Sequence, residues 1–226
     1  MRQTPEGADV RSPKTTGFVS RHRYRRAVAP VVLLAAAVAV GISAAPGSAR
    51  HAKLKPGPWC GGTLWRQMNL SDVDKKKIDA TPQNTTVQEI SGLTPPVKIG
   101  LRRTTPFQRQ VWHLDVVIDR YRIGTDGEIA LVLFSIPTGQ YMNAYLANPS
   151  CLTPGSRMRR QIVAARDELK DHCPRVTASW QLLGISVELT GVGFWNPVRS
   201  TKGALPNGAE LRPVTGLTIA SGCGIP

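Results

Sequence analysis

The 226-residue chain has few aromatic residues, few acidic residues and only one long apolar run. A single run excludes a protein that crosses a membrane many times. The 21 Gly and 18 Pro follow no fixed period, which excludes collagen-like and coiled-coil chains. Hydrophobic residues make up 41% of the chain, too large a share for a wholly disordered protein. We therefore expect one ordinary domain with a tail.

The first 45 residues have a polar start, a basic block at residues 21–26 and an uncharged apolar run at 27–45 that ends in small residues. This pattern is typical of a secretory signal peptide. An uncleaved membrane anchor is the alternative, because the run approaches the about 20 residues that a membrane span needs. We expect an exported protein, either secreted or in the cell envelope, whose only membrane contact would be this N-terminal segment.

Basic residues outnumber acidic ones, 29 Lys and Arg against 15 Asp and Glu, for a formal net charge of +14. Residues 1–45 hold seven of the basic and two of the acidic residues, so the remainder carries +9. A charge of this size favours a polyanionic partner such as nucleic acid or an anionic envelope polymer. The alternative is that the charge only keeps the protein soluble.

All four cysteines, Cys60, Cys151, Cys173 and Cys223, lie beyond the signal sequence, which predicts two disulfides. We prefer the pairs Cys60–Cys223 and Cys151–Cys173, because the first would join the two ends of the domain. No two cysteines are spaced closely enough for a zinc site, and we predict no metal and no cofactor.

Residues 46–106 read as a linker and an irregular N-terminal segment, and residues 107–220 as the folded domain, followed by a tail at 221–226. Period-two alternation and turn residues predict strands at 112–119, 129–135, 140–146, 185–190 and 209–219, and helical spacing predicts a helix at 156–172. The order β-β-β-α-β-β predicts a mainly β domain with one helix. An OB-like five-stranded barrel is the preferred fold, and an open α+β sheet is the alternative.

Two stretches resemble a family of exported, functionally uncharacterised bacterial proteins. The first is DGEIALVL at 126–133 with GQYMNAYLANPSC at 139–151, where the family reads DGDIHLVL and G-x-TMIAEIPDPSC. The second is GVGFWNPVRSTKG at 191–203 with ALPNGAELRPV at 204–214, where the family reads GVGFFDFxHGQxGxAPNGIELHPV. The resemblance implies export and no particular activity.

This chain departs from those motifs at their histidines and carboxylates. In order, His, Glu, Asp, His and His of the motifs are replaced by Ala130, Tyr145, Asn196, Arg199 and Arg212. Arginine cannot act as a general acid or base near neutral pH, and its charge repels a metal ion. The departures therefore imply that any acid–base or metal chemistry of the relatives is largely lost here.

The predicted binding residues lie on one face of the third predicted strand and in the loop after the fourth. OB folds bind oligomers near this face, and aromatic side chains with cations suit single-stranded nucleic acid or sugar chains. The candidates are Tyr141, Asn143, Tyr145, Arg199, Lys202 and Arg212.

Catalysis has weaker support, because the chain lacks the G-x-S-x-G and H-E-x-x-H motifs. His113 and Asp115 share a strand face, and Glu210 is retained in the second motif. We expect a non-catalytic OB-like module that binds an anionic or sugar polymer. The alternatives are a degenerate or unrecognised hydrolase or nuclease, and an envelope protein that acts through protein contacts.

Overall fold

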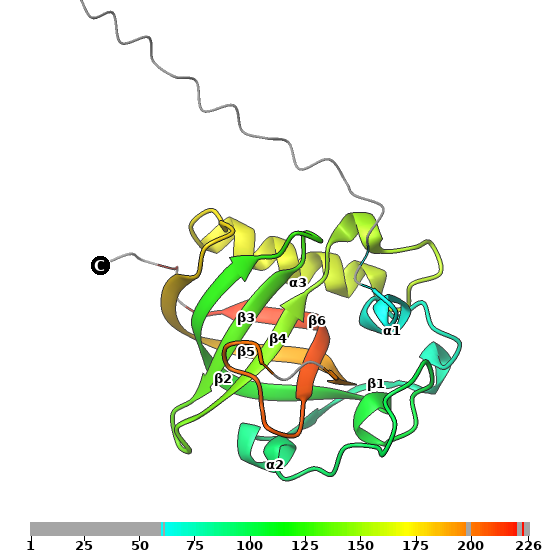
Figure 1. The fold of residues 1–226 in the computed structure, drawn as a ribbon. Helices are drawn as coiled ribbons and strands as arrows, with labels where there is room; N and C mark the ends of the chain where they lie inside the picture. The colour runs from blue at the N-terminus through cyan, green and yellow to red at the C-terminus, as the bar shows by residue number, and fades with distance from the viewer. Residues whose placement is uncertain (1–59, 61, 198–199, 221–222, 224–226) are drawn as a thin grey trace, which may run out of the picture. The chain divides into compact units, whose positions relative to one another are not determined.

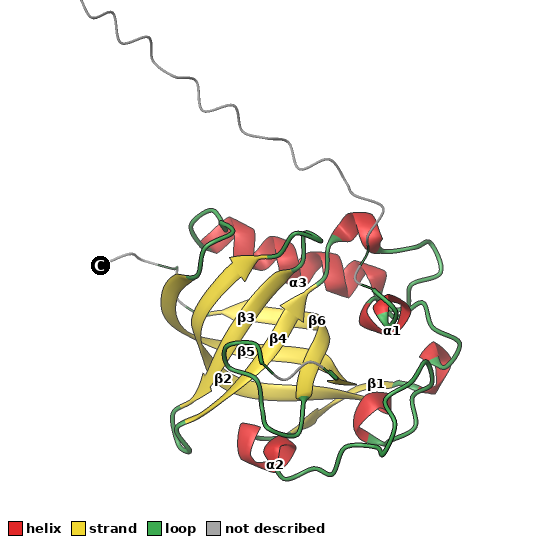
Figure 2. Ribbon diagram, viewed as in Figure 1, coloured by secondary structure: helices red, strands yellow, loops and turns green. Residues whose placement is uncertain are grey.

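The computed structural model describes Cys60, residues 62–197, residues 200–220 and Cys223 (Figure 1). The signal peptide or anchor expected within residues 1–45, Arg199 and all of the 221–226 tail except Cys223 lie outside the described residues. The described part is mainly β, as the sequence predicted (Figure 2).

Within the described residues, six strands form one mixed sheet. They are β1 (Asp79–Asn84), β2 (Gln110–Ile123), β3 (Ile129–Ser135), β4 (Gln140–Leu146), β5 (Gln181–Trp195) and β6 (Ala209–Ile219). The hydrogen-bonded order is β1-β2-β3-β4-β6-β5, and an additional pairing of β2 with β5 closes a ring through five strands. Neighbours are antiparallel except for the parallel pairs β1–β2 and β4–β6. An open α+β sheet, the alternative fold expected from the sequence, would lack the pairing of β2 with β5.

In the part of the chain that the structure describes, three α-helices accompany the strands, where the sequence predicted one. They are α1 (Trp65–Met68), α2 (Val87–Ser91) and α3 (Arg159–His172), and three short 3₁₀ turns lie at Lys75–Lys77, Phe107–Arg109 and Pro149–Cys151. Helices of four or five residues are too short for a periodic signal; a capping box between Thr86 and Glu89 defines the start of α2. No helix among the described residues is long and apolar enough to cross a membrane.

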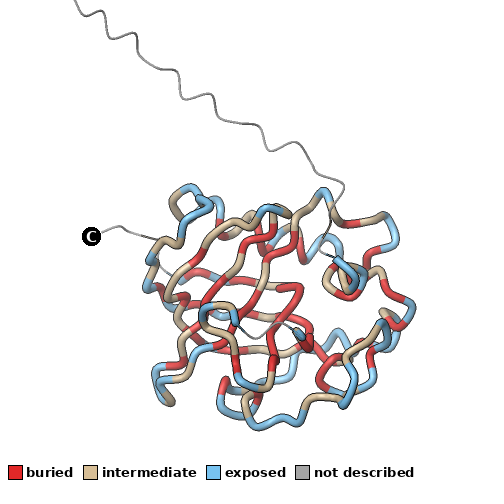
Figure 3. Tube along the Cα trace, in the orientation of Figure 1, coloured by how far each residue is buried: buried red, intermediate tan, exposed pale blue. Residues whose placement is uncertain are grey.

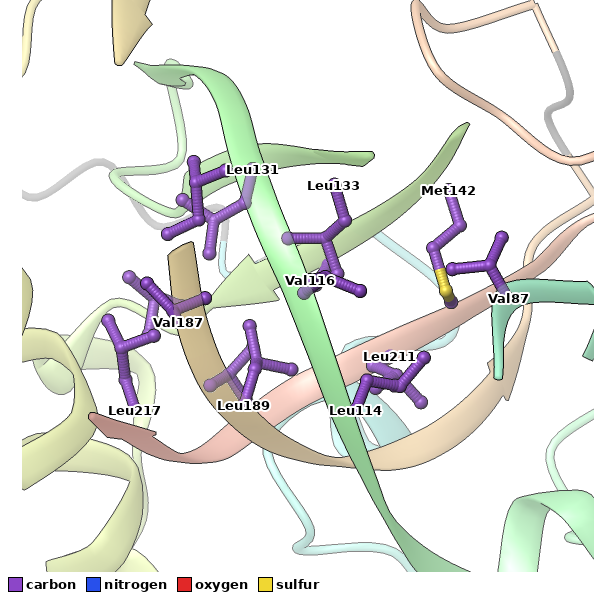
Figure 4. Close-up of a cluster of buried hydrophobic side chains, with 14 of the residues drawn as sticks. Val87, Leu114, Val116, Leu131, Leu133, Met142, Val187, Leu189, Leu211 and Leu217 are labelled. Carbon is purple, nitrogen blue, oxygen red and sulfur yellow. The ribbon is translucent and has the colours of Figure 1, made fainter. Parts of the chain in front are cut away.

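Apolar side chains from all five strands of the ring fill its interior (Figure 4). On β4, Met142, Ala144 and Leu146 are fully buried, as their alternation predicted. Leu169 of α3 and Val87 of α2 join the same core; in Figure 1, α3 lies above the strands and α2 below them. Burial follows the strands, whereas most exposed residues lie in loops (Figure 3).

Residues 62–106, expected to be a linker and an irregular segment, contain β1 and two helices and pack onto the start of β2. Leu70 and Ile78 form a second apolar cluster with Val111 of β2 and other side chains. The buried Arg103 donates to the Asp72 carboxylate, with Nη2 2.9 Å from Oδ2. This ion pair braces the segment internally, whereas the apolar cluster and the hydrogen bond from Nη1 of Arg103 to the Gln108 carbonyl, at 3.0 Å, hold the segment against the ring.

Strand β5 extends to residue 195, past the predicted end at residue 190, into a stretch that was expected to be a loop. Gly191 and Gly193 in this part of β5 allow neighbouring segments to pack closely against the strand. A Cβ on Gly193 would lie 2.1 Å from the carbonyl oxygen of Phe107, and one on Gly191 would lie 2.9 Å from Cβ of Leu211. The glycines therefore let the backbones approach, although in sequence they look like turn residues.

All four cysteines form disulfides, but the preferred pairing was wrong. Cys60 is bonded to Cys151 and Cys173 to Cys223, with Cα–Cα distances of 5.4 and 4.7 Å. Helix α3, about 21 Å long, separates Cys151 from Cys173. It packs against β6, so its end meets the chain that leaves β6. Disulfides are typical of proteins in an oxidising environment such as the extracellular space.

Candidate functional site

A pocket of about 390 Å³ opens on the outer face of the strand ring. We call it the outer pocket. Its floor residues on β3, β4 and β6 alternate with core side chains and therefore point away from the core. The β2–β3 turn, the segment before β5 and the loop before β6 form its walls. The lining includes Arg122, Asp126, Glu128, Ala130, Asn143, Tyr145, Trp180, Thr201, Lys202 and Arg212.

Four of the six predicted binding residues line the outer pocket: Asn143, Tyr145, Lys202 and Arg212. Tyr141 lies elsewhere on β4, is 43% exposed and packs against Phe134 with ring centroids 4.9 Å apart. Arg199 lies outside the described residues. The structure thus brings together side chains from β4, from β6 and from the loop between β5 and β6.

Arg212 is buried and surrounded by carboxylates, which the sequence interpretation did not foresee. Its guanidinium binds the Glu128 carboxylate, and Nη2 lies 4.0 Å from Oδ2 of Asp126. Nη1 lies 3.5 Å from Oε1 of Glu210, and the guanidinium carbon sits 4.3 Å from the ring centroid of Tyr145. Burial lowers the pKa of Arg212 to about 10, so it stays charged at neutral pH. Its charge is balanced within the protein.

Glu210 and Asn143 are neighbours across β6 and β4, and both are almost fully buried. Oε2 of Glu210 accepts from Nδ2 of Asn196 at 3.0 Å. Burial raises the pKa of Glu210 to about 8, so this carboxyl is mostly protonated at neutral pH. Nδ2 of Asn143 donates to Thr201, but Oδ1 has no hydrogen-bond partner among the described residues. Oδ1 is itself shielded from solvent, so the amide of Asn143 serves the packing of the pocket floor.

Arg122 and Trp180 form the opposite wall of the outer pocket, with the guanidinium carbon 4.7 Å from the ring centroid. Lys202 is exposed on the loop side. Neither Arg122 nor Lys202 has a carboxylate within 4.0 Å among the described residues. These two cations are therefore open to a ligand. No local pattern in the sequence distinguishes Trp180 from the core residue Trp195.

Four of the five positions at which this chain departs from the resembled motifs lie at the outer pocket or beside it; the fifth, Arg199, lies outside the described residues. Ala130, Tyr145 and Arg212 line the outer pocket, and Asn196 holds Glu210 beside it. The small side chain of Ala130 leaves space at the floor between its neighbours on β2 and β4. No histidine or cysteine is among the lining residues. The lining offers binding groups and lacks an imidazole for proton transfer.

The weak catalytic candidates His113, Asp115 and Glu210 do not come together in one site. His113 and Asp115 contact each other on the outer face of β2, with Nε2 3.3 Å from Oδ1. Asp115 lines a different cavity, of about 370 Å³. Glu210 lies beside the outer pocket, with its contacts to Asn196 and Arg212. Within the described residues, no cluster of three or more His, Cys, Asp or Glu side chains could hold a metal ion.

Comparisons with protein-family models and with curated proteins find no match to this chain. The resemblance noted in the sequence therefore stays a prediction, and the arrangement of the outer pocket is the basis for a functional conclusion.

Proposed function

We propose that the protein is an exported, non-catalytic, OB-like module that binds a unit of an acidic glycan in the outer pocket. The observation that carries the proposal is the convergence of two aromatic side chains, two open cations and several hydrogen-bonding groups in one pocket. The two disulfides support export.

The topology supports the OB-like part of the proposal. Helix α3 lies between the third and fourth strands of the ring, the position predicted for it from the sequence. The outer pocket lies over β3 and β4, the second and third strands of the ring, and next to the β2–β3 turn. OB folds bind oligosaccharides and oligonucleotides on this face and in the loops beside it.

The pocket lining matches the chemistry of a sugar ring. Tyr145 and Trp180 supply aromatic surface. Asp126 and Thr201 supply acceptors and a donor for hydroxyl groups, which both donate and accept. The volume of about 390 Å³ falls within the range of small-molecule sites. A single sugar unit with its neighbours extending along the surface would fill such a pocket.

The open cations Arg122 and Lys202 favour a ligand that carries a negative charge. A carboxylate on the sugar would satisfy them, whereas Arg212 is occupied by Glu128. A nucleic-acid strand needs several cations along its backbone. Asp126 and Glu128 in the lining disfavour a row of phosphates, so the glycan is the better match.

Binding can be measured by calorimetry, whose signal does not depend on Trp180 and which therefore also serves a variant that lacks this pocket residue. Full-length protein would be titrated with a trimer of galacturonic acid, with a neutral maltotriose and with single-stranded oligothymidine. We expect the acidic trimer to bind at least tenfold more tightly than the neutral one. Trp180→Ala should weaken that binding at least tenfold.

The matched charge variants are Lys202→Gln in the pocket and Lys98→Gln outside it, both on exposed loops. Lys202→Gln should weaken binding of the acidic trimer several-fold, and Lys98→Gln should leave it unchanged. Equal effects of the two lysine variants would refute the pocket assignment. Binding of the acidic trimer that Trp180→Ala leaves unchanged would refute it as well. Tight oligothymidine binding that falls steeply with salt would favour nucleic acid instead.

A further inference from the structure

Three arginines are buried in the described part of the chain: Arg103, Arg166 and Arg212. Two of them have a carboxylate as counterion. Arg103 contacts Asp72, and Arg212 contacts Glu128. Buried charges in proteins are normally paired in this way, because an uncompensated buried charge is costly.

Arg166 on α3 is the exception. It is 8% exposed, and no carboxylate lies within 4.0 Å of it among the described residues. Its Nη1 donates to the backbone carbonyls of Leu146 and Ala147, each at 3.1 Å. Asp167 and Asp126 act on it only from farther away, and burial lowers its pKa. The carbonyl oxygens orient the guanidinium but do not neutralise it.

Arg166 lines a separate cavity of about 300 Å³ between α3, the adjoining ends of β2 and β3 and the segment after the helix. Two more cations, Lys170 and Arg175, line the same cavity. The other lining residues are apolar: Ile123, Ile129, Pro174 and Val176. No aspartate or glutamate is among the lining residues, in contrast to the outer pocket.

We propose that this cavity is a second binding site, which takes an anionic group attached to an apolar body. The carboxylate or phosphate of the ligand would supply the counterion that Arg166 lacks, with Lys170 and Arg175 around it. The apolar side chains would contact the remainder of the ligand. Of its lining residues, Ile123 also borders the outer pocket, but the proposal does not depend on the ligand proposed there.

The cationic side chains and the apolar side chains of the lining together define the ligand. Free phosphate would satisfy the cations but leave the walls of Ile123, Ile129 and Val176 in water. An uncharged alkyl chain would cover the walls but leave Arg166 without a counterion. An amphiphilic anion satisfies both, and burial of its apolar part adds about 0.8 kcal/mol per CH₂.

Full-length protein would be titrated by calorimetry with decanoate, decanol and inorganic phosphate. We expect decanoate to bind with one-to-one stoichiometry and at least tenfold more tightly than either of the other two. Decanoate should also raise the melting temperature, because it binds only the folded protein. No saturable binding of decanoate at millimolar concentration would overturn the proposal. If decanol or phosphate bound as tightly as decanoate, the proposal that the ligand combines an anionic group with an apolar body would be overturned.

The variants use exposed residues, because Arg166 also bonds the backbone and its replacement could disturb folding. Lys170→Gln with Arg175→Gln removes two cations that line the cavity, and we expect at least tenfold weaker decanoate binding. Arg160→Gln removes an exposed cation of the same helix that does not line the cavity. An equal loss in the Arg160 variant, or no loss in the double variant, would refute the site.

Discussion

Replacing Arg212 with methionine tests whether this residue serves the fold or the ligand. Its guanidinium binds Glu128 and lies near Asp126 and Glu210 while almost fully buried. Methionine keeps much of the apolar volume but leaves the Glu128 carboxylate without a cation. Breaking a buried ion pair from one side typically costs about 3–5 kcal/mol. We expect Arg212→Met to lower the free energy of unfolding by about 4 kcal/mol.

A double-mutant cycle separates the ion pair from the other contacts of Arg212. Glu128→Met alone should cost about 2 kcal/mol, because the Asp126 carboxylate, 4.0 Å from Nη2, can still partly compensate Arg212. The double variant removes both charges, so it should cost about 3 kcal/mol, less than the two single changes together. The coupling energy would then be about 3 kcal/mol.

The assay is urea unfolding at neutral pH, followed by tryptophan fluorescence with the disulfides intact. An unchanged denaturant slope would show that the midpoint shift reports stability. A loss below about 1 kcal/mol for Arg212→Met would contradict the burial argument. Additive costs in the double variant would contradict the pairing of Arg212 with Glu128.

Three further predictions concern stability. Glu210, with its pKa raised from 4.5 to about 8, holds a proton in the folded state that the unfolded chain has released. Stability should therefore fall as pH rises through this window, by up to about 1.4 kcal/mol per pH unit, and urea unfolding of Glu210→Gln should lose this slope. Gly193→Ala would place Cβ 2.1 Å from a backbone oxygen and should cost about 3 kcal/mol in thermal unfolding, whereas Gly100→Ala, with nothing within 4 Å, should cost under about 0.5 kcal/mol. Peptide mapping of unreduced protein should recover Cys60 linked to Cys151, and replacing both by serine should cost about 4.5 kcal/mol, since their bond closes a loop with a sequence separation of 91.

Local patterns predicted three strands with their bounds: apolar runs or alternating side chains flanked by turn residues. The bounds of β3, β4 and β6 match the predicted residues 129–135, 140–146 and 209–219. Strand β1 was missed because all six of its side chains are exposed, so it has no apolar alternation to detect. The extension of β5 was missed because Gly191 and Gly193 resemble turn residues until the neighbouring backbone is known.

Part of the candidate site was also predicted from a local pattern. Alternation placed Asn143 and Tyr145 together on the face of β4 away from the core, and both line the outer pocket. Asp126 and Glu128 were not singled out, because in sequence they belong to an ordinary turn. Their contacts with Arg212 join residues more than 80 positions apart, and such contacts leave no local pattern.

The sequence by itself determined the faces of the strands, the helix before β5 and the presence of two disulfides, because side-chain periodicity and cysteine content are properties of a short stretch or of composition. Tertiary structure alone decided the disulfide pairing, the closure of the strand ring and which charges are buried. Each of these depends on which distant segments pack together, as α3 against β6 brings Cys173 to Cys223. Arg212 and Lys202 look alike as basic residues in sequence. Burial against Glu128 makes the first a counterion within the fold, and exposure leaves the second open to a ligand.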